Sequence, residues 1–159
     1  MNKGKILQYD PPKVIYEKPA NMFVGGFIGA PPMNFIEASI VEEGNKILLD
    51  AVIFKHPLSS EIANIVKSKA TSERVILGFR PEDISLSIKK NPESVFQADL
   101  YVIEPMGSNI IVDLKAGEHL IKAVLSPSAH LPLIGEKVWV SFSYDRIHIF
   151  DAKTEQAVL

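Results

Sequence analysis

A short apolar segment with an abrupt end, Pro19–Phe35, separates a helical beginning of this chain from a strand-rich remainder. It reads PANMFVGGFIGAPPMNF. Pro19 suits the first position of a helix, where its missing N–H would have no intrahelical partner. Gly29 suits a left-handed residue after the helix, and Pro31-Pro32 prevents the helix from continuing. The segment therefore predicts a short helix that ends in an immediate turn.

From Asn34 onward the sequence favours β-structure. Residues 35–42 alternate apolar and polar side chains, which is the period of a half-buried strand. Gly44-Asn45 is typical of a hairpin, and Pro57–Ala70 is the one helical interruption, with Ser59 or Ser60 as its cap. Turn residues then recur at intervals of roughly 8–12 residues without helices between them, which favours small barrels over a parallel α/β sheet.

The remaining expectations concern individual elements. A brief helical turn is expected at Lys13–Lys18, a turn at Pro81–Asp83, and a solvated tail over residues 152–159. The expected strands are Gly4–Tyr9, Phe35–Glu42, Lys46–Lys55, Arg74–Arg80, Ser85–Lys89, Val95–Glu104, Ile110–Lys115, His119–Leu125, Glu136–Phe142 and Arg146–Phe150.

The composition excludes several classes of protein. Hydrophobic residues make up 47% and charged residues 23% of the 159 residues, as in ordinary globular domains. The net charge of −2 and the isoelectric point near 6.1 disfavour a dedicated nucleic-acid binder. The absence of cysteine excludes disulfides, thiolate zinc sites and cysteine nucleophiles. No apolar run approaches the ~20 residues of a membrane-spanning helix, and we expect a cytoplasmic protein.

Four stretches, in this order, carry a resemblance that extends over nearly the whole chain. They are residues 4–35, followed by LGFRPEDI (Leu77–Ile84), EPMGSN (Glu104–Asn109) and HIFD (His148–Asp151). Together they resemble the C-terminal part of the ATPase subunits of ABC sugar importers of the maltose-uptake type. The resemblance implies a mainly β fold of two small OB-like (MOP/TOBE-type) barrels with interleaved strands, preceded by a short strand-helix segment.

The same resemblance implies two parts of different origin. Residues 1–33 would be a remnant of the end of an ABC nucleotide-binding domain, and residues 34–159 a β-rich OB-like regulatory domain. We expect the remnant to be ordered only if it packs on the rest of this chain or on a second copy. The apolar side chains expected to do so are Met22, Phe23, Val24, Phe27 and Ile28.

The motifs that hydrolyse ATP are absent from this sequence. None of its nine glycines forms G-x-x-x-x-G-K-[ST], the loop whose backbone N–H groups cradle phosphates. The LSGGQ-like signature of the family is absent too. We therefore expect a regulatory and dimerisation module that is not itself an enzyme and carries no cofactor. Its implied partners are a second copy, the nucleotide-binding domain, the membrane permease subunits at the inner face of the membrane, and regulatory proteins.

A second hypothesis rests on fold analogy. OB-type barrels also serve as free-standing modules that bind an oxyanion such as molybdate, or single-stranded nucleic acid. The Gly107–Asn109 turn could form an anion-binding nest of backbone N–H groups, although a plain β-turn is the simpler interpretation. Trp139 could stack on a sugar or a base, or be covered by barrel packing.

The candidate site residues are regulatory or dimer contacts at two turns. Arg80 ends an apolar strand before a proline that keeps it extended, and its guanidinium can clamp a carboxylate. A local lock of the turn is the competing interpretation. The full set is Arg80, Glu82, Asp83, Gly107, Ser108 and Asn109. No catalytic or metal residues are expected, because the four histidines lack metal-binding spacing and the acidic pairs lie in solvated turns.

Overall fold

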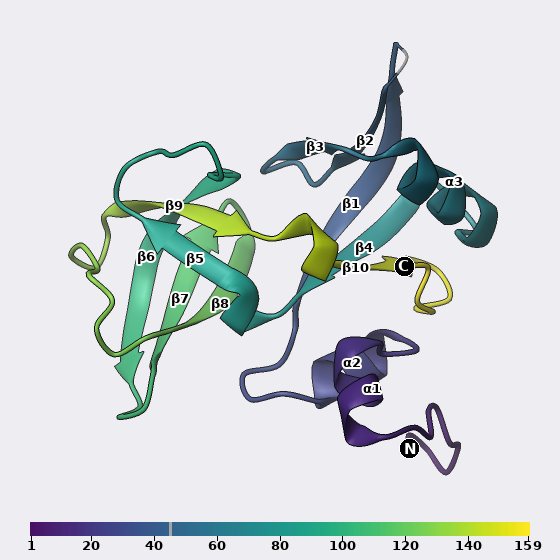
Figure 1. The fold of residues 1–159 in the computed structure, drawn as a ribbon, viewed down its shortest axis with the longest axis horizontal. Coiled ribbons are helices and arrows are strands. Elements are labelled where there is room, and N and C mark those ends of the chain that lie inside the picture. Colours follow the sequence, from purple (N-terminus) through teal and green to yellow (C-terminus); the bar gives the residue numbers. More distant parts are fainter. Residues whose placement is uncertain (45) are drawn as a thin grey trace. The chain divides into compact units, whose positions relative to one another are not determined.

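The computed structural model of the chain describes residues 1–44 and 46–159. Asn45, and with it half of the predicted Gly44-Asn45 hairpin signal, lies outside the described residues. The chain forms two compact units (Figure 1). Unit 1 contains residues 1–79 and 148–159, and unit 2 contains residues 80–147. Each unit holds one five-stranded sheet.

The sheet of unit 1 is antiparallel and combines strands from both ends of the chain. Its order is β10-β4-β1-β2-β3. The chain leaves unit 1 after β4 and returns as β10, which pairs with β4 (His148↔Gly78). The interleaving of strands predicted above is thus confirmed. The strands are β1 (Asn34–Glu43), β2 (Lys46–Asp50), β3 (Lys55–Pro57), β4 (Arg74–Phe79) and β10 (His148–Asp151).

The sheet of unit 2 is also antiparallel, in the order β5-β9-β6-β7-β8. Its pairing is regular except for a bulge in β6 between Leu100 and Val102. Two 3₁₀ turns, η1 (Pro81–Asp83) and η2 (Tyr144–Arg146), lie near its two ends in sequence. The prediction of a mainly β, OB-like fold is confirmed. The strands are β5 (Ile84–Ser87), β6 (Phe96–Pro105), β7 (Ile110–Ala116), β8 (His119–Leu125) and β9 (Lys137–Phe142).

The alternation read from the sequence decides which side chains form the core. In β1, Ile36, Ala38 and Ile40 are at most 7% exposed, whereas Glu37 between them faces solvent. In unit 2, Leu100 and Leu114 are fully buried on neighbouring strands in the same register. Burying one such side chain contributes about 1.5–3 kcal/mol. These inward positions therefore fix the register of both sheets.

Both N-terminal helices are short. The predicted turn at Lys13–Lys18 forms helix α1 (Pro12–Glu17), and the apolar segment forms α2 (Met22–Phe27). The prediction that Pro19 begins the second helix is wrong. Asn21 is the N-cap, and its side-chain oxygen accepts a hydrogen bond from the Val24 N–H at 3.0 Å. A capping side chain satisfies a backbone donor, which proline at a first helical position cannot do.

Helix α2 lies on the sheet of unit 1 through its glycines. A Cβ built on Gly25 would be 3.2 Å from Met33 Sδ, and one on Gly26 would be 3.2 Å from Phe35 Cε2. Phe35 in turn meets Phe150 of β10 edge to face. The prediction that this segment packs on its own chain is confirmed for Val24, which is 8% exposed, but not for Phe27, which is 72% exposed.

Helix α3 (Ser60–Lys69) follows the predicted helical pattern. Ser59 is its cap, because its Oγ accepts a hydrogen bond from the Ile62 N–H at 3.2 Å. Ala63 and Val66 are the buried side chains of the helix. Among the described residues, no helix is both long enough and apolar enough to cross a bilayer.

The strand expected at Gly4–Tyr9 does not form. A bridge between Asn2 and Lys5 closes a tight turn instead, with Gly4 at φ 77°. Residues 6–9 lie in no strand. A strand of apolar pattern needs a neighbour to satisfy its backbone groups, and the described part of the chain provides none at this position.

The solvated tail expected over residues 152–159 was also wrongly predicted. Val158 is 2% exposed, and its N–H donates to the Ile149 carbonyl at 2.7 Å. The Ala157 N–H donates to the Ala20 carbonyl at 2.9 Å. The polar residues KTEQ (153–156) are exposed, but the backbone beneath them is paired, and the Thr154 hydroxyl donates to Asp151 Oδ1. These residues are therefore an integral part of unit 1.

Candidate functional site

The first candidate stretch, Arg80–Asp83, is a locked turn. Arg80 is extended (φ −78°, ψ 144°) and precedes η1, in which the Asp83 N–H donates to the Arg80 carbonyl at 3.1 Å. The Arg80 side chain is 3% exposed. Burial lowers its pKa from the usual value, and the nearby Asp83 carboxylate opposes that shift. A guanidinium so deeply buried has little surface to offer a partner, and the nearby Asp83 carboxylate compensates part of its charge.

Asp83 connects this turn to another part of unit 2. Its Oδ1 lies 3.4 Å from Arg146 Nη1, so η1 is tied to η2. Partial burial raises the pKa of Asp83, while Arg146 and Arg80 act in the opposite direction. Glu82, between Arg80 and Asp83, is exposed. Of this stretch, Glu82 is therefore the side chain available to a partner.

The second candidate stretch, Gly107–Asn109, is the turn of the β6–β7 hairpin. The Met106 N–H donates to the Asn109 carbonyl at 2.9 Å, and the Ser108 N–H donates to the Met106 carbonyl at 3.1 Å. Gly107 has φ 83°, which glycine adopts without strain. Because the Ser108 N–H serves the turn itself, the geometry favours a plain β-turn over an anion-binding nest.

The structure does not bring the two stretches into one site. In Figure 1 the turn lies at the tip of the β6–β7 hairpin, whereas η1 immediately precedes β5. Both stretches expose side chains or backbone on unit 2, with Glu82, Gly107 and Ser108 exposed and Asn109 half-buried. They can therefore belong to one contact region only as two separate patches of it.

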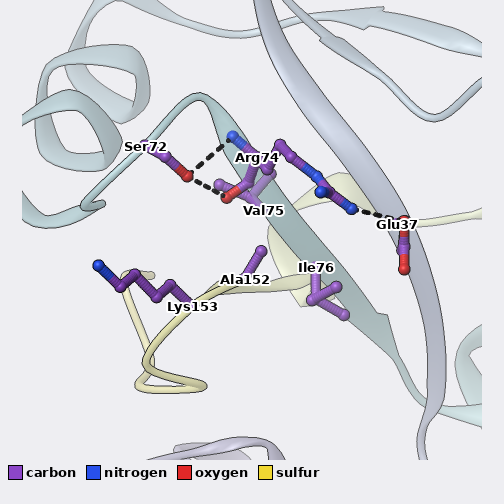
Figure 2. A pocket seen from close by; sticks show the side chains of 7 residues that line it. All are labelled: Glu37, Ser72, Arg74, Val75, Ile76, Ala152 and Lys153. Carbon is purple, nitrogen blue, oxygen red and sulfur yellow. Dashed lines mark hydrogen bonds and ion pairs between the residues drawn. The ribbon is translucent and has the colours of Figure 1, made fainter.

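A pocket that the sequence did not indicate lies on the sheet of unit 1 (Figure 2). It has a volume of about 330 Å³ and is bordered by β1, the start of β4 and residues 152–153. Arg74 Nη2 reaches Glu37 Oε2 at 3.2 Å across it, with both side chains 72% exposed. An ion pair so exposed contributes about 0–1 kcal/mol. Glu37 is simply an outward position of an alternating strand, so no motif marks this pocket.

A wider groove adjoins it between the end of β1 and α3. Its volume is about 590 Å³, and Glu42 and Lys67 form an ion pair beside it. The hydrogen bond from Lys67 lowers the pKa of Glu42. Within residues 1–44 and 46–159, no three His, Asp or Glu side chains are placed to hold a metal ion.

Trp139 and two of the histidines contact other residues of the fold or are partly buried in it. Trp139 is half-buried, and Lys90 Nζ lies 5.0 Å from the centroid of its ring. A cation over an indole face is a favourable contact, and it covers part of the surface on which a sugar or base would stack. Burial lowers the pKa of His56. His148 lies beside Phe150, with ring centroids 6.3 Å apart.

Comparison with known domain families assigns both units. Residues 29–84 match the MalK OB fold domain, and residues 77–150 match the TOBE domain. The two matches overlap at LGFRPEDI and together extend from the end of α2 to β10. The two domain matches follow one another along the sequence, whereas the two compact units do not. The end of the TOBE match, β10, lies in the sheet of unit 1.

Curated relatives align with nearly the whole chain. An ABC transporter ATP-binding protein of Bacillus subtilis, YurJ, is 36% identical over 99% of the chain and 44% of its own length. The multiple sugar-binding transport ATP-binding protein MsmK of Streptococcus mutans is 35% identical over 98% and 41%. The trehalose/maltose import ATP-binding protein MalK of Thermococcus litoralis is 33% identical over 99% and 43%. The chain thus spans less than half the length of these relatives.

A solved structure has the same kind of fold. The molybdate-binding protein ModG superposes with a TM-score of 0.55 over 73% of this chain and 94% of its own, at 12% sequence identity. At that identity the likeness concerns the fold alone. The domain matches and the relatives, taken with the two antiparallel sheets, show that the chain belongs to the ABC transporter ATP-binding proteins, of which it carries the MalK-type OB-fold and TOBE region.

Proposed function

We propose that the chain is the regulatory and dimerisation module of an ABC sugar-importer ATPase subunit. The observation that carries this proposal is the continuous match of residues 29–150 to the MalK OB fold and TOBE domains. Two relatives, MsmK and MalK, have sugar transport in their names, which supports sugars as the transported class. In this view residues 1–33 end a nucleotide-binding domain and residues 34–159 form the regulatory domain.

The implied partners follow from the same proposal. A second copy would pair with this module, and the permease subunits would hold the assembled ATPase at the inner face of the membrane. Regulatory proteins would bind the exposed surface of the module. A coupling of this kind requires two global states of the assembly that contact the module differently.

The proposal includes the absence of ATP chemistry in these 159 residues. Neither of the two cavities described above is lined by a glycine-rich loop with a lysine at its end, and the sequence has no such motif. We expect titration of the purified chain with Mg-ATP in a calorimeter to give no more heat than dilution. Hydrolysis should equal that of a protein-free control. Saturable binding in the micromolar range would contradict this part of the proposal.

For the dimer, we propose that contacts come from the exposed members of the two turns. Glu82, Gly107 and Ser108 are exposed, whereas Arg80 acts through the turn that it supports. The variant Glu82→Lys reverses a charge on one of these patches. We expect it to weaken self-association at least tenfold, because a like or unpaired charge in a contact costs more than about 1.4 kcal/mol. Sedimentation equilibrium measures this directly.

Two variants provide the controls. Glu118→Lys makes the same charge change in the exposed turn between β7 and β8 and should leave the dimer unchanged. Arg80→Ala should lower the melting temperature, because it leaves the partly buried Asp83 carboxylate without one of its two nearby cations and vacates buried volume, while changing dimer affinity little. If Glu118→Lys weakens the dimer as much as Glu82→Lys does, net charge rather than the turn is responsible. A wild-type chain that stays monomeric at high micromolar concentration would remove the dimer proposal for this chain.

A further inference from the structure

Residues 152–159 contact the start of helix α2 through the backbone. The Met22 N–H donates to the Glu155 carbonyl at 2.9 Å, and the Ala157 N–H donates to the Ala20 carbonyl at 2.9 Å. These two bonds flank a bridge between Asn21 and Gln156. Asn21 is the residue whose side chain caps α2. The segment is therefore bonded to the backbone that sets the position of the helix.

The same residues are bonded to the sheet on their other side. The Val158 N–H donates to the Ile149 carbonyl at 2.7 Å, and the Ile149 N–H donates to the Leu159 carbonyl at 3.2 Å. Lys69 of α3 donates from Nζ to the Val158 carbonyl at 3.2 Å. Residues 152–159 thus cover the outer edge of β10, which would otherwise present unpaired backbone groups.

Helix α2 has few other means of holding its position. It has six residues, and a helix of that length is unstable by itself in water. Val24 is its one buried side chain, and its closest approach to the sheet is made by Gly25 and Gly26, which have no side chain to interlock. Phe27, its largest side chain at the C-terminal end, is 72% exposed. The backbone bonds to residues 155 and 157 therefore supply a large part of its anchorage.

We propose that residues 152–159 form a clasp that locks helix α2 onto the sheet of unit 1. Because the clasp bonds to both α2 and β10, order in the clasp and docking of α2 form one cooperative event. Releasing the clasp frees α2 and exposes the edge of β10 together. If residues 1–33 adjoin a nucleotide-binding domain, as proposed above, the clasp fixes the connection between that domain and the sheet.

Hydrogen exchange on the full chain tests the clasp with the variant Ala157→Pro. Proline removes the donor to the Ala20 carbonyl, and Gln156 before it is already paired as in a strand, a conformation compatible with a following proline. We expect exchange of the Gly25 and Ile28 amides to quicken about tenfold, the effect of losing one or two net hydrogen bonds. Exchange in β4 and in unit 2 should not change. Ala157→Gly keeps the N–H and serves as the matched control.

A milder variant guards against misfolding of the proline variant. Lys69→Met removes only the bond from α3 to Val158, and we expect a few-fold faster exchange of the Val158 and α2 amides together. Unchanged exchange in α2, or an equal increase throughout unit 1, would overturn the proposal. The measurement needs no nucleotide, permease or second copy, so a negative result would leave the proposed function standing.

Discussion

Replacing Gly78 by alanine is expected to lower the free energy of unfolding of unit 1 by about 2–3 kcal/mol. A Cβ at this position in β4 would lie 2.7 Å from Met33 Sδ and 2.8 Å from Phe150 Cε2. Phe150 is fully buried and Met33 is 4% exposed, so neither side chain can move away without disturbing its own neighbours. The added methyl group therefore forces the sheet and the residues beneath α2 apart.

Urea denaturation followed by two signals measures this effect. Circular dichroism reports on both units, whereas fluorescence of Trp139, the single tryptophan of the chain, reports on unit 2. The control is Gly26→Ala, whose Cβ would approach the edge of the Phe35 ring at 3.2 Å. Alanine also favours a helix over glycine by up to about 1 kcal/mol, so this variant should be near neutral. A Gly78→Ala protein as stable as the wild type would contradict the close packing described here.

The strands could be predicted because their signal is local. Ile36, Ala38 and Ile40 alternate with polar neighbours, and the strand needs one buried face, so pattern and burial coincide. Turns were predicted for the same reason, since Pro81 and Gly107 have backbone requirements of their own. The return of the last strand to the first sheet came from the family resemblance and not from the pattern.

The parts of the fold that the sequence did not predict, residues 152–159 and the start of α2, are held by backbone hydrogen bonds between residues far apart in the chain. Residues 152–159 include the polar side chains expected of a solvated tail, yet their N–H and carbonyl groups form hydrogen bonds with residues 20–22 and with Ile149. Backbone donors are the same in every residue type, so no side-chain pattern records such pairing. Asn21 did carry a signal, because asparagine is a preferred cap, but the proline two residues earlier obscured it.

The candidate site residues were likewise predictable only in part. Proline and glycine marked both turns correctly, but they do not determine which side chains of a turn are buried. Arg80 is 3% exposed and Glu82 is exposed, although they are separated by one residue. Asp83 pairs with Arg146 because η1 and η2 meet in the folded unit. The distinction between a turn lock and a contact surface therefore depends on tertiary packing.

The last strand ends in an aspartate that supports the clasp, and its removal is expected to have a large effect. Asp151 is 1% exposed and accepts five hydrogen bonds. Three come from the backbone N–H groups of Thr71 (2.5 Å), Lys153 (3.0 Å) and Thr154 (2.7 Å). Two come from the hydroxyls of Thr71 (2.8 Å) and Thr154 (2.9 Å). Asp151→Ala should lower Tm by roughly 10 °C, because these donors lose a charged acceptor.

The pH dependence of stability isolates the charge. The hydrogen bonds from Thr71 and Thr154 hold the pKa of Asp151 well below its usual range. A group whose pKa is lower in the folded state stabilises the fold in full above its unfolded pKa of about 3.9, and that contribution declines as the pH falls from there towards the lower pKa of the folded state. Asp151→Asn keeps one acceptor oxygen but cannot titrate. Thermal melts between pH 7 and pH 3 should therefore show the advantage of the wild type over Asp151→Asn beginning to narrow below about pH 4, and parallel curves would show that the carboxylate charge does not stabilise this turn.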